Sequence, residues 1–429
     1  MKKVNKETVR QQVWSQINKL FELYVDESDG WKYAKQAAWR PADIFKRLVQ
    51  ADLEQMSIED VCTDFEGCSA DTVHRRMIDL QFGATVRVLN DMLRYSVQGF
   101  QFHGNERLTV AIDITDNPWY GDRQHEFCVG SKGKQGTFYF NRYFTACILT
   151  QGYRIPLYVC PIRQEDGVSC HGLVEDFLRE AYWWFPFKRL LADSWFFSAE
   201  LLDLFDLFGL EFLIPLKGRR RPKEVIDDIR ATQRQMATVA GVNITQAKHL
   251  YRWLKRHKFI TFTFEIMSKF PRNRRYPVAV TTVLRAKQYG GNHTEHYLDL
   301  YVFTTNIQGS GEGLKPEYRR RWGIETQYRV VHQFQAKTSS LSSTLRVFLF
   351  GLGLILTATW LRLNAFLERS SAKVKKKVAS SLYLRIYVRN KVVPIGKKLK
   401  RIIQLLWRSM GLDQKRLAER LACSGKWTI

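Results

Sequence analysis

The spacing of the apolar residues changes near Gly104, and this change constrains the fold more than any other feature of the sequence. Between residues 7 and 99 apolar side chains recur every three or four positions, which predicts helices. After Gly104 the sequence becomes rich in β-branched residues, beginning with LTVAIDIT at 108–115, which predicts strands. We therefore expect a helical N-terminal region followed by a layered α/β region.

The α/β region alternates strand-like and helix-like segments. The expected strands are 108–115, 137–149, 153–162, 189–193 and 211–216, and the expected helices are 173–183 and 198–208. An inserted α+β domain then interrupts the series, with strand-like runs at 259–267 and 276–284, before a strand at 297–305 and a helix at 315–335. The predicted organisation is a helical region at 1–105, a core of a mixed sheet flanked by helices at 106–217 and 297–340, the insertion at 218–296, and a basic helical region at 341–429.

The segment 57–80 has the pattern of two short helices joined by a turn. Ser57 and Ser69 stand as cap residues before the two helices, and Gly67 lies in the turn. The second helix carries Arg75 and Arg76, which could contact DNA if that helix entered a major groove. A helical hairpin that only packs against the core would show the same pattern, so this segment alone leaves both interpretations open.

The charge of the chain favours a polyanionic partner. Lys and Arg number 67 against 42 Asp and Glu, a formal net charge of +25, and residues 364–429 contribute 17 basic and three acidic residues, or +14. A hydrophobic content of 45% excludes disorder as the main state, so the excess charge indicates a folded protein that binds nucleic acid before an acidic membrane. The seven cysteines are scattered without a Cys-x-x-Cys pair, which favours a reduced protein with neither disulfides nor a zinc ribbon.

The most apolar segment is 347–361 (VFLFGLGLILTATWL), which is closed by Arg346 and Arg362. Fifteen residues are short for a hydrocarbon layer of about 30 Å, so a buried helix of a soluble domain is the favoured interpretation. Residues 1–14 are basic and polar and lack the apolar run of a secretory signal. We expect a cytoplasmic protein without a membrane partner.

Three acidic residues stand out by their positions. Asp113 lies inside the first strand, Asp193 closes the fourth strand, and Glu325 lies on the helix after the insertion. A carboxylate inside a strand is costly unless a partner compensates its charge, and a bound cation is such a partner. Convergent carboxylates with open positions suit Mg²⁺. Three separate salt bridges would explain the same residues, and each acid taken singly favours that explanation.

The helix that carries Glu325 also carries an ordered set of cations. Tyr318, Arg321, Glu325, Arg329 and His332 have offsets of 0, 3, 7, 11 and 14 residues, which place them in one narrow stripe at about 100° per residue. A metal-binding carboxylate beside arginines that hold phosphate oxygens is an arrangement for phosphoryl transfer.

With these residues the chain resembles a DDE transposase of a prokaryotic insertion sequence, in the branch whose last catalytic helix bears Tyr-x-x-Arg-x-x-x-Glu. That motif is Tyr318, Arg321 and Glu325 here, and IDITDNPWYG at 112–121 and LLADSWFF at 190–197 supply the two aspartates. The resemblance covers about 108–337. It implies an RNase H-like core with an insertion between the second Asp and the Glu.

The resemblance also implies the chemistry and the partners. Asp113, Asp193 and Glu325 would be catalytic and would hold Mg²⁺, expected as two ions with Mn²⁺ as a substitute. The implied activity is cleavage at the ends of an insertion sequence followed by strand transfer into target DNA. The implied partners are the terminal inverted repeats, the target DNA and a second copy of the chain in a homodimer at the nucleoid.

This sequence departs from the family pattern at two places. The pattern has a Lys about seven residues after the Glu, where His332 stands here, and Lys337 follows five residues later. Asp116 lies three residues after Asp113 and is the second candidate for the first catalytic acid. Trp253, in the basic insertion, could stack on a flipped base, although a core Trp is the more common case.

Two other functions stay open on the sequence. An RNase H-like nuclease could use the same carboxylates without strand transfer. A helix-turn-helix regulator without catalysis would need no carboxylate set, so intact Asp113, Asp193 and Glu325 argue against it.

Overall fold

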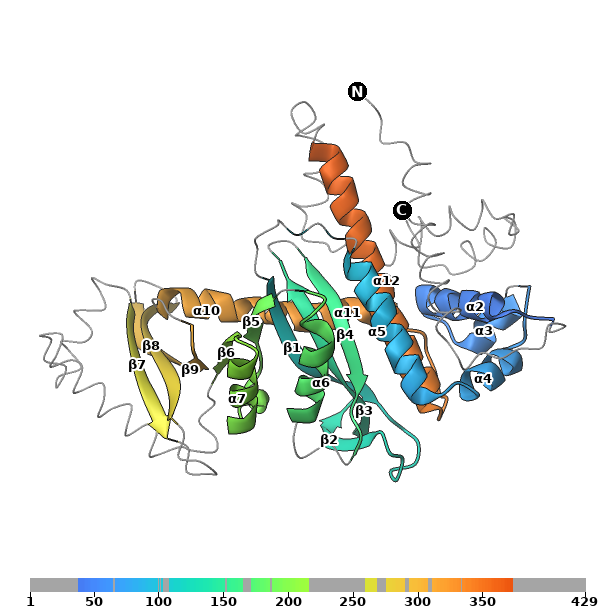
Figure 1. Ribbon diagram of the computed structural model, residues 1–429, viewed down its shortest axis with the longest axis horizontal. Coiled ribbons are helices and arrows are strands. Elements are labelled where there is room, and N and C mark those ends of the chain that lie inside the picture. Colours follow the sequence, from blue (N-terminus) through green and yellow to red (C-terminus); the bar gives the residue numbers. More distant parts are fainter. Residues whose placement is uncertain are drawn as a thin grey trace, which may run out of the picture.

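The computed structural model describes residues 38–372, apart from 65, 99, 101, 103–107, 151–152, 165–170, 186, 216–258, 268–274, 290–292, 308–310 and 333. Figure 1 shows the described chain as a central sheet with helices on both sides and a separate helical unit. Trp253 and the basic segment after 372 lie outside the described residues.

Within the described residues, four helices precede the sheet: α2 (Pro41–Glu54), α3 (Ile58–Asp64), α4 (Ala70–Ile78) and α5 (Phe82–Gln98). The backbone N–H of Asp60 donates to Ser57 Oγ at the start of α3, and that of Thr72 donates to Ser69 Oγ at the start of α4. These side chains satisfy donors that the first helical turn leaves unpaired, so the helices begin where the cap residues predict. The two short helices expected within 57–80 are α3 and α4.

The sheet contains nine strands. They are β1 (Leu108–Pro118), β2 (Cys128–Lys134), β3 (Thr137–Leu149), β4 (Arg154–Pro161), β5 (Phe187–Leu191), β6 (Glu211–Pro215), β7 (Phe259–Met267), β8 (Arg275–Tyr289) and β9 (His293–Thr305). Their order is β2-β3-β1-β5-β6-β9-β8-β7, with β4 also paired to β3. The strand β3 is antiparallel to β1 and β4, whereas β1, β5 and β6 are parallel neighbours. The expectation of an RNase H-like α/β core with a mixed sheet is confirmed.

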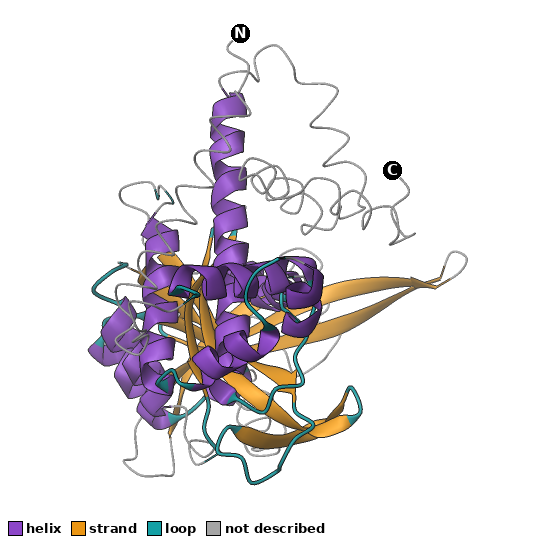
Figure 2. Cartoon of the chain, turned by 90° about the vertical axis from the view of Figure 1, so that its right-hand side faces the viewer, coloured by secondary structure: helices purple, strands orange, loops and turns teal. Residues whose placement is uncertain are grey.

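The strands β7, β8 and β9 continue the core sheet beyond β6. β9 pairs antiparallel with β6 through Leu213 and Thr305, and β8 pairs with β9 from Val278 to Tyr289. Figure 2 shows these long strands running out from the body of the chain. One edge of the RNase H-like core is thus covered by these strands.

Helices cover both faces of the sheet. α6 (His171–Ala181) and α7 (Ala199–Leu207) bury Phe177 and Phe205 against one face, together with Ile112 of β1. α10 (Gly311–Arg320) and α11 (Trp322–Val331) bury Leu314 and Ile324 against the other face. Because successive side chains of a strand point to opposite faces, Asp113 shares a face with Ala111 and therefore lies beneath α10 and α11.

The apolar segment 347–361 lies within α12 (Ser343–Ala372). Ser343–Arg362 has the length and hydropathy of a membrane span, and 89% of that window is buried inside the structure. In Figure 1 the helix lies along α5, and it also contacts β4, α2 and α4. Gly351 allows the close approach, because a Cβ there would come within 2.7 Å of Leu89 Cδ1 on α5. The segment packs as the core helix that its length predicts.

We predict that the packing of α12 contributes strongly to stability. Phe348 is fully buried and meets Phe45 of α2 edge to face, with ring centroids 6.5 Å apart. Phe348→Ala should lower the free energy of unfolding by about 3–5 kcal/mol, because it removes apolar contacts and leaves a cavity. Denaturant unfolding would measure this change. The control Leu341→Ala removes an exposed side chain and should change it little; equal losses in both variants would contradict the assignment of α12 to the core.

Candidate active site

Two of the predicted acids lie at the same level of neighbouring parallel strands, Asp113 inside β1 and Asp193 two residues past the end of β5. β1 pairs with β5 so that Ala111 lies opposite Leu191, and Asp113 and Asp193 each come two residues later. Asp193 leaves the strand and caps a short 3₁₀ helix, η2 (Ser194–Phe196), where its carboxylate accepts the backbone N–H of Ser194 and the Ser194 hydroxyl. The carboxyl ends of adjacent parallel strands are where α/β sheets place their sites.

Glu325 lies on α11, above the sheet, and Arg321 connects it to Asp113. The guanidinium of Arg321 donates to Asp113 Oδ2 at 3.1 Å and to Glu325 Oε1 at 2.9 Å. Its Nε donates to the hydroxyl of Tyr318 at 3.1 Å. Arg321 is only 5% exposed, so one buried cation joins the strand carboxylate, the helix carboxylate and the phenol.

The predicted helix at 315–335 is divided at Arg321. α10 ends at Arg320, α11 begins at Trp322, and the N–H of Ile324 bonds to the carbonyl of Arg321, three residues back. Arg321 keeps helical angles (φ −55°, ψ −36°), so the stripe of Tyr318, Arg321 and Glu325 survives the interruption. The prediction of a single helix was wrong because such a local change of hydrogen bonding leaves no periodic signal.

The electrostatic environment of Asp113 favours its neutral form. Burial raises the pKa of this carboxyl to about 6; the Arg321 guanidinium opposes the rise, and the charges of Asp193 and Glu325 add to it. Burial also raises the pKa of the Tyr318 hydroxyl to about 12, which keeps the phenol protonated near neutral pH. The site gathers more negative charge than Arg321 alone compensates.

The donor atoms suit a hard divalent cation. Asp113, Asp193 and Glu325 offer only carboxylate oxygens, the ligands that Mg²⁺ prefers. A cation would offset the repulsion from Asp193 and Glu325, which adds to the effect of burial in raising the pKa of Asp113. Within the described part of the chain no three His, Cys, Asp or Glu side chains are drawn together tightly enough to enclose an ion. The geometry gives the reason, because the Arg321 guanidinium lies between Asp113 and Glu325.

Asp116, the second candidate for the first acid, lies in a different environment. Three residues along a strand change the face, so its side chain points away from that of Asp113. It pairs with Arg142 at 2.7 Å and with Lys134 at 3.4 Å. These partners form a salt-bridge cluster separate from the contacts of Arg321.

The remaining residues predicted to contact phosphate lie on α11, just after it, or on α4. Arg329 and Lys337 are exposed, and exposed His332 shares a hydrogen bond of 3.0 Å between its Nδ1 and Gln335 Oε1. Arg75 and Arg76 belong to α4 in the N-terminal helical unit, where Arg75 is exposed and pairs with Asp71. They lie on a different element from the carboxylates.

The segment after α11 is held by α2. The fully buried Asp52 accepts the backbone N–H of Ala336 at 2.8 Å, and burial raises the pKa of its carboxyl well above the usual value. The N–H of Lys337 donates to the carbonyl of Met56, and Gln55 Nε2 donates to the carbonyl of His332. The N-terminal helices therefore fix the end of the helix that carries Glu325.

Sequence reasoning missed the support beneath Asp113. Thr145 lies opposite Asp113 on β3, and its hydroxyl is 2.6 Å from the buried hydroxyl of Tyr328 on α11. The position of Tyr328, three residues after Glu325, was the available signal. Nothing in the sequence linked it to Thr145, which is 183 residues away.

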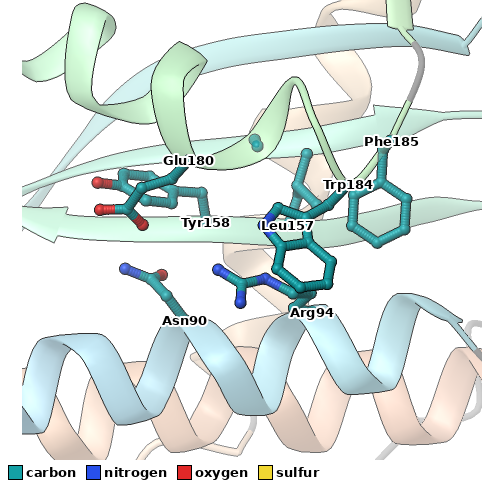
Figure 3. Close-up of a pocket in the computed structure, with 8 residues that line it drawn as sticks. Asn90, Arg94, Leu157, Tyr158, Glu180, Trp184 and Phe185 are labelled. Atoms are coloured by element: carbon teal, nitrogen blue, oxygen red, sulfur yellow. The ribbon is translucent and has the colours of Figure 1, made fainter.

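A small cavity lies elsewhere, between α5, α6 and β4 (Figure 3). Asn90, Arg94, Tyr158, Glu180 and Trp184 are among its lining residues, and the Arg94 guanidinium lies 4.1 Å from the centre of the Trp184 ring. Its volume of about 10 Å³ is close to what one water molecule needs. The cavity contains none of the three predicted acids.

We predict that Asp113 makes stability depend on pH. Its pKa of about 6 in the folded chain exceeds the ordinary value of 3.8, so the folded state holds this proton more tightly than the unfolded state. The stabilisation is complete below about pH 4 and is lost as the pH rises through about 6. In a chelating buffer, the melting temperature of the wild type should fall relative to that of Asp113→Asn as the pH is raised from about 4 to above 6. Asp122→Asn, which removes an exposed acid, should behave as the wild type; parallel curves for Asp113→Asn and the wild type would contradict the assignment.

Comparison with known proteins places these features in a family. No curated protein matches the chain. A family model described as a transposase DDE domain matches residues 106–361, more than half of the sequence and the range that contains β1, β5 and α11. The family uses divalent metal ions and acts on DNA. The chain therefore belongs to the DDE transposase family.

Proposed function

We propose that this transposase cleaves a phosphodiester bond at each end of an insertion sequence and then joins the freed 3′-hydroxyl to target DNA. The observation that supports the proposal most is that Asp113 and Asp193 lie at the same level of adjacent strands, with Glu325 above them, around buried Arg321. The resemblance of the same residues to the family motif points to the same chemistry.

Asp113, Asp193 and Glu325 would hold Mg²⁺, with Mn²⁺ as a substitute and two ions in the complete site. When bound, the metal supplies Lewis-acid stabilisation of the oxygens that carry charge during phosphoryl transfer. The chain's own part is to keep these carboxylates aligned. Arg321 does this by holding Asp113 and Glu325 in fixed positions.

The cations around the carboxylates would position the DNA. The Arg321 fork and the Tyr318 hydroxyl lie next to the carboxylates, and Arg329, His332 and Lys337 continue along the exposed side of the same segment. Arginine holds phosphate oxygens in paired hydrogen bonds, so these side chains would fix the phosphate that is cut. Arg75 and Arg76 on α4 would contact the terminal repeat at a distance from the cut.

The assembly would be a homodimer that brings two element ends together in the prokaryotic cytoplasm, at the nucleoid. The direct experiment is incubation of the purified chain and Mg²⁺ with a duplex that joins the element's terminal repeat to its flanking DNA. A denaturing gel would separate nicks, hairpins and joined products. Nicks without joined products would favour an RNase H-like nuclease, and binding without cleavage would favour a non-catalytic regulator.

We predict that each carboxylate is required for cleavage. Asp113→Asn, Asp193→Asn and Glu325→Gln should abolish nicking, because each removes a metal-binding charge. Binding to the duplex in a gel-shift assay should stay largely intact, since contacts to the DNA backbone are separate. Wild-type nicking by Asp113→Asn together with an inactive Asp116→Asn protein would show that Asp116 is the first catalytic acid.

Arg321 should not tolerate lysine. A lysine ammonium is a point charge and cannot donate to Asp113, Glu325 and Tyr318 in the same planar geometry. Arg321→Lys should slow cleavage and strand transfer at least about tenfold, or about 1.4 kcal/mol, measured as single-turnover rates. The control Arg319→Lys changes an exposed cation of α10 and should leave the rates unchanged. Full activity of Arg321→Lys would identify the arginine as structural.

A further inference from the structure

The strands β1, β2 and β3 extend beyond the level of Asp113 and Asp193. The last residue of β1 that pairs with β5 is Ala111, but β1 continues to pair with β3 as far as Pro118, opposite Phe140. β2 then pairs with the first residues of β3. In Figure 1 β2 lies at the lower end of the sheet. The β2–β3 hairpin therefore stands beyond the carboxyl end of β5, on the side where Asp193 follows that strand.

The tip of this hairpin has a defined shape. Gln135 and Gly136 both have positive φ, 52° and 78°, as a two-residue turn between Lys134 and Thr137 requires. The hydroxyl of Tyr120 donates to the carbonyl of Gln135 at 2.8 Å. Phe138 lies over Gly133, where a Cβ would come within 2.7 Å of its ring. The surface is therefore organised before any partner arrives.

The exposed side chains of the tip are aromatic and basic. Tyr120 is 68% exposed and Phe138 66% exposed, and Lys132 and Lys134 are exposed beside them. The segment 128–142 contains three cations and no acid. Arg142 is neutralised by Asp116, to which Lys134 also reaches. The nearest acids before the hairpin in the sequence are Asp122 and Glu126, which belong to the loop that precedes it. The charged side chains of the hairpin itself are all basic.

This composition fits nucleic acid better than an apolar protein surface. Lysines bind backbone phosphates without reading sequence, and exposed rings stack on bases or pack on sugars. An interface with another protein copy would be expected to have fewer lysines at its centre. The charge of the hairpin therefore favours a polyanion as its occupant.

The position of the hairpin sets where on the DNA it would bind. Thr145 lies opposite Asp113, and seven residues of β3 separate it from Phe138, which is about 24 Å of strand at about 3.4 Å per residue. The rise of B-DNA is also about 3.4 Å per base pair, so this length corresponds to about seven base pairs. We propose that Tyr120, Lys132, Lys134 and Phe138 form a duplex-binding surface that contacts DNA about seven base pairs from the bond that is cleaved. This inference rests on the proposed function for the location of that bond.

Photo-crosslinking tests the location. The full-length chain would carry p-benzoylphenylalanine in place of Phe138 and would be irradiated with the duplex of terminal repeat and flanking DNA. We expect crosslinks centred about seven base pairs from the nick, and none when the same group replaces Trp183. Trp183 is 83% exposed at the end of α6, near the opposite, amino end of β5. Crosslinks to a second copy of the chain, or none in a sample that is nicked, would overturn the inference. A crosslinked sample without nicks would instead overturn the proposed function.

Salt dependence tests the chemistry. Lys132→Ala should reduce the slope of log K against log salt by about 0.9 if the lysine binds one phosphate. Phe138→Ala should weaken binding to the same duplex and leave that slope unchanged, because the ring carries no charge. Arg179→Ala removes an exposed cation from α6 and is the matched control, with no change expected. Unchanged affinity and slope in both hairpin variants would show that the surface does not touch DNA.

Discussion

The buried guanidinium of Arg321 is the interaction on which the site depends. Removing such a charge from water costs several kcal/mol, which only well-placed partners offset, and Asp113, Glu325 and Tyr318 supply them. Because one partner lies on β1 and two lie on the covering helices, the contacts fix how α10 and α11 sit over the sheet. The same cation opposes the rise in the pKa of Asp113 that burial causes and that the charges of Asp193 and Glu325 increase. Fold and chemistry are coupled at this residue.

Much of the core could be predicted because its signals are local. β3 has the predicted bounds of 137–149, and the acids follow strands whose apolar runs are unmistakable. β2 was missed, since CVGSKGK combines two glycines with two lysines and shows no alternation. The strand forms because β4 pairs with β3 only at residues 143–149, so the edge of β3 at residues 137–141 is available to pair with β2. The partners of Arg321 and Tyr328 were not predictable for a related reason: they are contacts between residues far apart in the chain.

The sheet explains how a long stretch of chain can separate Asp193 from Glu325. The strand β9 runs antiparallel to β6 and leads to α10 on the face where Asp113 lies. The chain that follows β6 thus returns at the neighbouring strand β9. The carboxylates themselves are positioned by β1, β5 and α11.

The hydrogen bonds between the end of α2 and the segment after α11 show that the folding unit begins before the first residue of the family match. The match begins at residue 106, yet Asp52, Gln55 and Met56 complete the hydrogen bonding of residues 332–337. α12 also buries its apolar side chains against α2, α4 and α5. A fragment cut at the family boundary would expose this helix and leave the Ala336 N–H without its acceptor. For expression, crystallisation or domain exchange, the smallest coherent piece begins upstream of α2.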